Sequence, residues 1–230
     1  MSIQALIFDF DGTILDTETP EFESWRDVYA DHGCELPRLL WENTIGRGKD
    51  QITFDPHTYL LERSEKPVDA DRIRVWRRER FAQRLAAEPL RAGVLAILLE
   101  AKAMGLKLGI ASSSDRAWVE GHLKRFEILS FFDATCCADD VSRTKPDPEL
   151  YRTALARLGA AAAEAIAVED SPNGLLAAKR AEIFCVAVPN PMTRNLIFDT
   201  PDLVLDSLEE RSLAALLEAA ESRTVFGGSV

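Results

Sequence analysis

The chain has 230 residues, of which 47% are hydrophobic and 28% are charged, as in ordinary soluble globular proteins that build a core of their own. Its formal net charge of −11 argues against nucleic-acid binding, because nucleic-acid phosphates favour a basic surface. No apolar stretch approaches the ~20 residues of a membrane-spanning helix, and no signal-peptide pattern opens the chain. We therefore expect a cytoplasmic protein without a nucleic-acid, membrane or obligate protein partner. The net charge does not exclude a small anionic ligand, because such a ligand responds to the charges of its own site.

Cysteines and histidines do not show the spacing of a metal site. The four cysteines contain no CxxC pair, and the three histidines are scattered along the chain. We expect free, buried thiols in a reducing compartment and no zinc site, and we assign no catalytic role to the histidines. The residues concerned are Cys34, Cys136, Cys137, Cys185, His32, His57 and His122.

The first predicted strand covers residues 3–9 and ends in two carboxylates. Its apolar residues are followed directly by Asp9-Phe10-Asp11-Gly12-Thr13. Buried carboxylates must be protonated, paired or bound to a metal, so this pair is costly unless the protein uses it. The C-terminal edge of a parallel sheet is also where α/β proteins place their active sites. The alternative is that Asp and Gly only form a turn after the strand.

Residues 16–88 show little strand signal and much helical pattern. Apolar spacing predicts one helix that contains Phe22 and stops at Gly33, and a second helix between Ile73 and Leu85. An insertion of this length after the first strand is typical of a helical lid. We therefore expect a core formed by residues 1–15 and 89–230, and a helical cap formed by residues 16–88.

Five further strands are predicted at residues 106–112, 133–137, 165–169, 184–188 and 203–205, with helical patterns between most of them. One helix starts at Asp147-Pro148, where Asp can cap and Pro suits the first helical position, and ends at Gly159. Another covers residues 172–180. Alternation of strands and helices predicts an α/β fold with a parallel sheet.

Three further polar motifs follow the first acid pair along the chain. They are Ser112-Ser113-Ser114-Asp115, Lys145 before a proline, and Glu169-Asp170. Each has an ordinary alternative when taken alone: the serines can cap a helix, the lysine can be solvated, and the acids can cap the helix that follows. An acid pair, a hydroxyl, a lysine and a second acid pair in this order resemble the four-motif signature of the haloacid dehalogenase (HAD) superfamily. The chain is most similar to its Mg-dependent phosphatase and phosphomutase members.

This resemblance covers nearly the whole chain. It implies a Rossmann-like parallel-sheet core with an inserted α-helical cap domain, and catalysis by Asp9, Asp11 and Lys145. Asp9 would be the nucleophile that forms an aspartyl phosphate. Asp11 would protonate the leaving oxygen and then activate water, while Lys145 would hold a positive charge between the phosphate and the nucleophile.

The resemblance also implies a Mg²⁺ cofactor and a phosphate-binding loop. The metal would be bound by the side chains of Asp9 and Asp170 and by the backbone carbonyl of Asp11, with Glu169 binding directly or through water. Ser112 and the amide of Ser113 would hydrogen-bond the phosphoryl oxygens.

Three branches of the superfamily differ at positions that this sequence shows. The dehalogenase branch lacks the second acid of the first motif, so Asp11 argues against it. The phosphonatase branch forms a Schiff base through a cap lysine, and Lys49 lies near the comparable position. That branch, however, has a small residue at the position of Asp11, so Lys49 is more consistent with a substrate contact. The β-phosphoglucomutase branch carries a cap histidine where Glu21 stands here.

We therefore expect Mg-dependent hydrolysis of a small phosphate monoester, such as a sugar phosphate, by an HAD-like phosphatase. The cap residues expected to contact the substrate are Glu21, Arg47, Lys49 and Arg77, although these charges can instead form a solvated helix face. A β-phosphoglucomutase-type phosphoryl transfer is the first alternative. A phosphonatase and a non-catalytic binder of phosphorylated metabolites are the others. The sequence does not identify the substrate.

Overall fold

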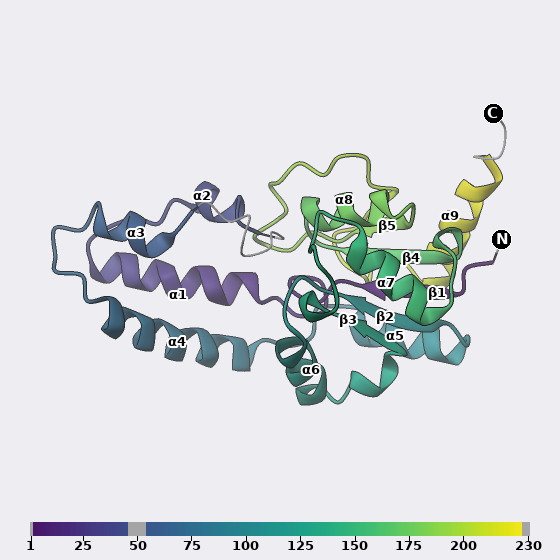
Figure 1. Ribbon diagram of the computed structural model, residues 1–230, viewed down its shortest axis with the longest axis horizontal. Helices are drawn as coiled ribbons and strands as arrows, with labels where there is room; N and C mark the ends of the chain where they lie inside the picture. The colour runs from purple at the N-terminus through teal and green to yellow at the C-terminus, as the bar shows by residue number, and fades with distance from the viewer. Residues whose placement is uncertain (1, 46–53, 227–230) are drawn as a thin grey trace.

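The computed structural model describes residues 2–45 and 54–226. Within these residues, six strands form one sheet in the order β3-β2-β1-β4-β5-β6, and every neighbouring pair is parallel (Figure 1). All six predicted strands are present, and the expected α/β fold is confirmed. The strands are β1 (Ala5–Phe8), β2 (Lys107–Ala111), β3 (Ala134–Cys136), β4 (Ala165–Glu169), β5 (Phe184–Ala187) and β6 (Leu203–Val204).

Alternating side chains of the strands pack on opposite faces of the sheet. In β1, Leu6 and Phe8 join the apolar cluster of α5 (Val94–Ala103), α6 (Arg116–Arg125) and α9 (Leu213–Phe226). Ala5 and Ile7 join the second cluster, which contains α7 (Glu149–Leu158) and α8 (Pro172–Arg180). The strand is apolar throughout because both faces of a parallel sheet are covered by helices. Short 3₁₀ helices in the described part of the core are η2 (Leu129–Phe131), η3 (Ala138–Asp140) and η4 (Ala162–Glu164).

The two helices predicted after the lysine motif are confirmed, with one small correction. Helix α7 begins at Glu149 with Pro148 as its N-cap, so Pro148 is not the first helical residue as expected. Asp147 still accepts a hydrogen bond from the amide of Glu149 at 3.0 Å. The helix ends at Gly159, whose φ of 62° is a left-handed conformation that glycine adopts without strain.

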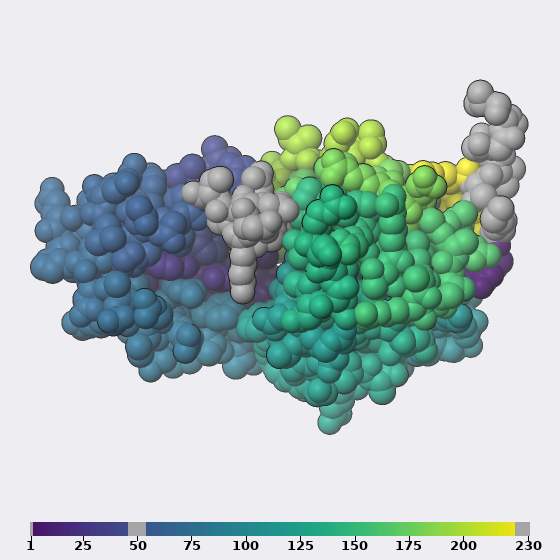
Figure 2. Space-filling view, viewed as in Figure 1, coloured from purple at the N-terminus to yellow at the C-terminus, as the bar shows by residue number. Residues whose placement is uncertain are grey.

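Residues 18–87, which lie between β1 and α5, form a separate group of helices at one end of the molecule (Figures 1 and 2). These are α1 (Glu18–Asp31), α2 (Arg38–Glu42), α3 (Pro56–Leu61) and α4 (Ala70–Ala87). They share an apolar cluster of their own that includes Phe22, Trp41 and Leu60. The two connections to the core pair with each other, through a bridge between Leu15 and Leu90. The helical group is therefore joined to the core at one paired hinge.

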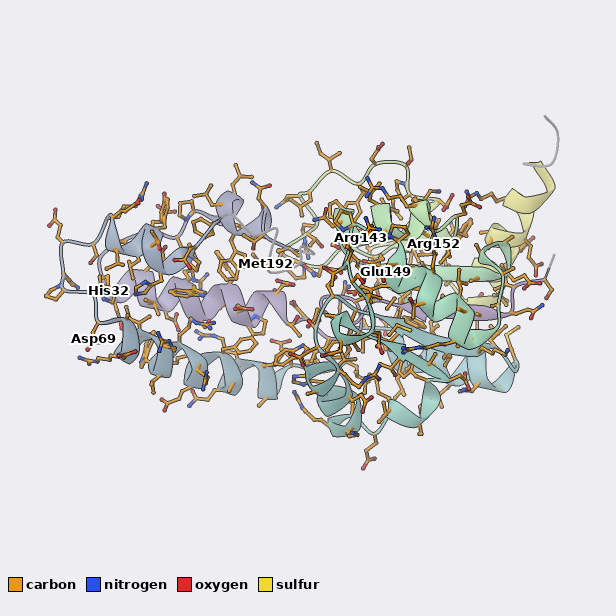
Figure 3. The ribbon with its side chains drawn as sticks, viewed as in Figure 1. His32, Asp69, Arg143, Glu149, Arg152 and Met192 are labelled. Atoms are coloured by element: carbon orange, nitrogen blue, oxygen red, sulfur yellow. The ribbon has the colours of Figure 1, made fainter. Side chains whose placement is uncertain are left out.

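Core residues also reach into this helical group. Met192, from the loop after β5, joins the apolar cluster of the helices and lies where the core meets them (Figure 3). The guanidinium of Arg38 donates to the carbonyl of Pro191 in the same loop. The loop after β5 thus forms a second contact between core and helices, separate from the hinge.

The cysteines are free, as expected, but only three are buried. Cys34 is half-buried, so the expectation of a buried thiol is wrong for that residue. Among the described residues, no helix combines the length and apolar character needed to cross a bilayer.

Candidate active site

Three buried carboxylates meet at the C-terminal ends of β1 and β4. These strands are direct neighbours with Phe8 opposite Val168, so the residues that follow them come together. The amide of Asp9 donates to the carbonyl of Val168 at 2.9 Å and continues the pairing beyond the strand. Ligand oxygens of Asp9, Glu169 and Asp170 all lie within 4.8 Å of one another. We call these three residues the carboxylate cluster.

Lys145 lies against the carboxylate cluster and is only 2% exposed. Its ammonium pairs with Asp9 and, at 2.7 Å, with Oε1 of Glu169. Burial by itself lowers the pKa of a lysine, but the two carboxylates more than offset this and raise the pKa of Lys145 above its usual value. Lys145 therefore stays positively charged at neutral pH.

One lysine does not neutralise three carboxylates. Burial raises the pKa of Asp9 to about 7, although Lys145 opposes the shift. Burial and the charges of Asp9 and Glu169 raise the pKa of Asp170 well above its usual value. Burial is the largest cause of both shifts, and the neighbouring carboxylates add to it. A bound cation would supply the positive charge that one ammonium cannot give to three carboxylates.

The donor set fits a hard divalent cation. Mg²⁺ prefers carboxylate and carbonyl oxygens, and the cluster supplies three carboxylates. The second oxygen of Glu169, Oε2, is buried and has no hydrogen-bond partner among the described residues. Asp170 is held by the Thr13 hydroxyl at 3.2 Å and by the Asn190 amide at 2.7 Å. The carboxylates are thus fixed and still have lone pairs to offer.

Two glycines allow the backbone to pass close to the carboxylate cluster. A Cβ on Gly12, whose φ is +81°, would lie 2.3 Å from Oδ2 of Asp170. A Cβ on Gly174, near the start of α8, would lie 1.8 Å from Oε2 of Glu169. No side chain fits at either position without displacing an acid of the cluster.

The side chain of Asp11 is not part of the carboxylate cluster. Its Oδ1 accepts hydrogen bonds from the Thr17 hydroxyl at 3.0 Å and from the indole of Trp118 at 2.8 Å. Its Oδ2 accepts from the Ser114 hydroxyl at 2.6 Å, and Ser112 lies at 3.4 Å. The expected metal contact of Asp11 was through its backbone carbonyl, so the direction of the side chain does not oppose it.

Residues Ser112, Ser113 and Ser114, which we call the serine loop, lie next to Asp11 and do not cap α6. The N-cap of this helix is Asp115, which accepts from the amide of Trp118 at 2.8 Å, so the capping alternative for the serines is wrong. Ser112 is fully buried. The Ser113 hydroxyl is buried and has no partner within the described part of the chain. The loop therefore holds a polar group that is available to a ligand.

The structure describes two of the four cap residues expected to contact a substrate. Glu21 and Arg77 form an ion pair with each other at 3.3 Å. The Arg77 guanidinium also lies over the ring of Trp25 at 5.0 Å. Burial raises the pKa of Glu21, and Arg77 opposes that shift. Arg47 and Lys49 lie outside the described residues.

Several residues around the site were not expected from the sequence. Tyr151 donates its hydroxyl to Oε1 of Glu169 at 2.5 Å, and Arg91 donates to the carbonyl of Gly12 at 2.6 Å. Burial and the nearby acids Glu21 and Asp11 raise the pKa of Glu18 well above its usual value. Thr13 and Ser114 lie inside two of the motifs but had no role assigned, and the others lie outside every motif, so these contacts are visible only in the folded chain. The unexpected set is Thr13, Glu18, Arg91, Ser114, Trp118, Tyr151 and Asn190.

Comparison with protein families then identifies the chain. A family model described as haloacid dehalogenase-like hydrolase matches residues 6–188, which contain the carboxylate cluster, Lys145 and the serine loop. The chain belongs to the haloacid dehalogenase-like hydrolase family. The resemblance predicted from the four motifs is confirmed.

Relatives of this HAD-like hydrolase align along nearly its whole length. YhcW of Bacillus subtilis (strain 168), provisionally named as a phosphatase, is 47% identical and covers 96% of this chain and 99% of its own. The validoxylamine A 7'-phosphate phosphatase of Streptomyces hygroscopicus subsp. limoneus is 31% identical over 89% of this chain and 94% of its own. These names agree with the expected class of enzyme, an HAD-like phosphatase.

A solved structure supports the same fold. A variant of CbbY from Rhodobacter sphaeroides, in complex with xylulose-(1,5)-bisphosphate, superposes on this HAD-like hydrolase with a TM-score of 0.72. The two chains are 30% identical, and the match covers 93% of this chain and 99% of CbbY.

Proposed function

We propose that this HAD-like phosphatase is a Mg²⁺-dependent enzyme that hydrolyses a small phosphate monoester through an aspartyl-phosphate intermediate. One observation carries the proposal: Lys145 bridges Asp9 and Glu169 inside a cluster of three buried carboxylates. A structural role alone does not explain a cluster that lacks positive charge, since buried ion pairs are normally balanced. A metal ion and a phosphoryl group together supply the charges that match it.

In the first step, a carboxylate oxygen of Asp9 forms a bond to phosphorus while the bond from phosphorus to the ester oxygen breaks. Asp11 gives its proton to the departing oxygen, so an alcohol leaves. Lys145 holds the nucleophile and offsets the charge of the phosphoryl oxygens. The Ser112 hydroxyl and the Ser113 amide donate to the same oxygens.

In the second step, Asp11 takes a proton from a water molecule, which attacks phosphorus. The bond between Asp9 and phosphorus breaks, so inorganic phosphate is released and the Asp9 carboxylate is restored. One residue serves first as the acid and then as the base, which returns the enzyme to its starting state.

We assign the Mg²⁺ ligands to the side chains of Asp9 and Asp170 and to the backbone carbonyl of Asp11. Glu169 already binds Lys145 and Tyr151 through Oε1, so it contributes through Oε2 or through a water molecule. When bound, the metal neutralises charge on the carboxylates and the phosphoryl group.

We propose that residues 16–88 are the cap and that their side chains select the substrate. The validoxylamine phosphatase and CbbY carry names that point to phosphorylated small molecules, which supports the same class of substrate here. Glu21, which is paired with Arg77, occupies the position of the mutase histidine, so hydrolysis is favoured over phosphoglucomutase chemistry. The free thiols are consistent with a cytoplasmic location.

Asp9→Asn tests the proposal most directly. The amide is nearly isosteric but has neither the nucleophilic nor the metal-binding charge, so we expect turnover of p-nitrophenyl phosphate to be abolished while the circular dichroism spectrum stays unchanged. The exposed Asp199 provides a matched control as Asp199→Asn, which should keep full activity. Activity of Asp9→Asn within tenfold of the wild type would reject Asp9 as the nucleophile. A panel of phosphorylated metabolites, including β-glucose 1-phosphate, would separate phosphate release from mutase activity.

A further inference from the structure

Trp118 connects the expected acid–base residue to the helical group. It lies on α6, and its indole nitrogen donates to Oδ1 of Asp11 at 2.8 Å. Its ring stacks on Phe81, which belongs to α4, with ring centroids 6.0 Å apart and an angle of 12° between the planes. A single side chain of the core thus contacts both the acid and a helix of the cap.

A second aromatic residue also contacts the ring of Trp118. His122, one turn further along α6, packs edge-on against it at 4.4 Å. His122 in turn stacks on Phe10, the residue between Asp9 and Asp11, at 6.0 Å. Aromatic contacts therefore run without a break from α4 to the first acid motif. This packing restricts the indole to one orientation, in which its N–H points at Asp11.

Filling space does not require a tryptophan at this position. A phenylalanine ring would also stack on Phe81, but it has no donor for Asp11. A buried indole N–H needs an acceptor, and a backbone carbonyl would satisfy it equally well. Here the acceptor is instead the carboxylate that would carry the proton. The Thr17 hydroxyl, from the connection that leads into α1, donates to the same oxygen at 3.0 Å.

We propose that Trp118 is a positioning residue that orients Asp11 and makes this orientation depend on the packing of α4 through Phe81. The proposal rests on the acid–base role assigned to Asp11 above. With α4 packed on α6, Phe81 holds the indole flat and the N–H stays on Oδ1. When α4 moves, the indole loses this contact and Asp11 loses one of its three side-chain donors at normal hydrogen-bond distance.

The test compares two substrates that differ in how much their leaving group needs a proton. Phenyl phosphate requires an acid, whereas p-nitrophenyl phosphate scarcely does. We expect Trp118→Phe to slow the first release of phenol in a rapid-quench experiment by about tenfold, because small displacements of a catalytic group are costly. The first release of p-nitrophenol should change by less than about twofold, since Asp9 and Lys145 are untouched. Equal losses for both substrates, or none for either, would overturn the proposal.

Phe81→Leu tests the connection to α4 while keeping the indole. We expect the same selective loss with phenyl phosphate, but a smaller one. The double variant should be no slower than Trp118→Phe alone, because Phe81 acts only through the indole N–H. Additive losses would show that Phe81 and Trp118 act independently. Trp76→Phe, on α4 but outside these contacts, is the matched control and should behave as the wild type. If Trp118→Phe fails to fold, Phe81→Leu still tests whether the packing of Trp118 affects proton transfer by Asp11, because this variant keeps Trp118.

Asp11→Asn separates this proposal from the proposed function. If Asp11 is the acid, Asp11→Asn alone must show a strong selective loss with phenyl phosphate. If it does not, the acid assignment fails, whatever Trp118→Phe shows. If Asp11→Asn is selective and Trp118→Phe is not, only the positioning role of Trp118 is rejected.

Discussion

Replacing Gly174 by alanine sets two opposite effects against each other. Gly174 lies inside α8, where alanine normally stabilises a helix by about 1 kcal/mol relative to glycine. The added Cβ would, however, lie 1.8 Å from Oε2 and 2.1 Å from Cδ of Glu169. Glu169 is fully buried and is tied to Lys145 and Tyr151, so it cannot move without disturbing both contacts.

The clash should outweigh the gain in helix propensity. Overpacking of a filled interior costs about 1–3 kcal/mol. Loss of a hydrogen bond to a charged group costs a further ~1.5–3 kcal/mol. After the gain in helix propensity is subtracted, we expect Gly174→Ala to destabilise the protein by about 3 kcal/mol. For a chain of this size, that corresponds to a Tm lower by roughly 6–12 °C.

Gly121 offers a matched control. It is an exposed glycine inside α6, and a Cβ there would meet no heavy atom within 4 Å. Gly121→Ala should therefore raise the Tm by about 2 °C, because only the helix propensity changes. Thermal unfolding of both variants and the wild type, followed by circular dichroism in EDTA, measures the difference. If Gly174→Ala melts at or above the wild-type temperature, Glu169 is not confined by its contacts with Lys145 and Tyr151.

Three further predictions concern charge and metal. The hydrogen bond from Arg157 lowers the pKa of Asp140 from 3.8 to about 2. The ionised Asp140 carboxylate therefore stabilises the fold fully above pH 3.8, and this stabilisation is lost as the pH falls towards 2. Asp140→Asn should therefore cost about 1–2 kcal/mol in urea unfolding at pH 7, and the difference from the wild type should narrow as pH falls below about 4; a constant difference would contradict this. Mg²⁺ should raise the Tm of the wild type and restore activity after treatment with EDTA. Ca²⁺ should restore activity poorly, because its looser coordination geometry misplaces Asp9. Asp170→Asn should lose most of the rise in Tm that Mg²⁺ causes in the wild type. Full activity after exhaustive chelation would exclude the proposed mechanism. Tyr151→Phe removes a buried donor to Glu169 and should lower the free energy of unfolding by about 1–2 kcal/mol, so an unchanged urea midpoint would contradict the hydrogen bond.

The strands and the acid motifs could be predicted from the sequence, because each is defined by residues that are neighbours in the chain. A buried parallel strand is a short apolar run, and each predicted run became a strand. Since parallel strands end at one edge, the acids after β1 and β4 had to approach each other if the two strands paired. The order of the four motifs also indicated Lys145 as their partner. Fold class and the members of the carboxylate cluster therefore followed from the sequence alone.

Contacts between helices, and between cap and core, were decided only by the tertiary structure. Nothing near Glu21 in the sequence indicates that Arg77 pairs with it, because the pair depends on how α1 packs against α4. Tyr151 lies on a helix that the sequence predicts, but its hydroxyl binds Glu169 only because α7 packs beside the end of β4. Trp118 gave no signal either, since its function depends on two partners from distant segments. The period of a helix predicts which of its faces is buried, but the atoms that meet that face are set by packing between segments far apart in the chain.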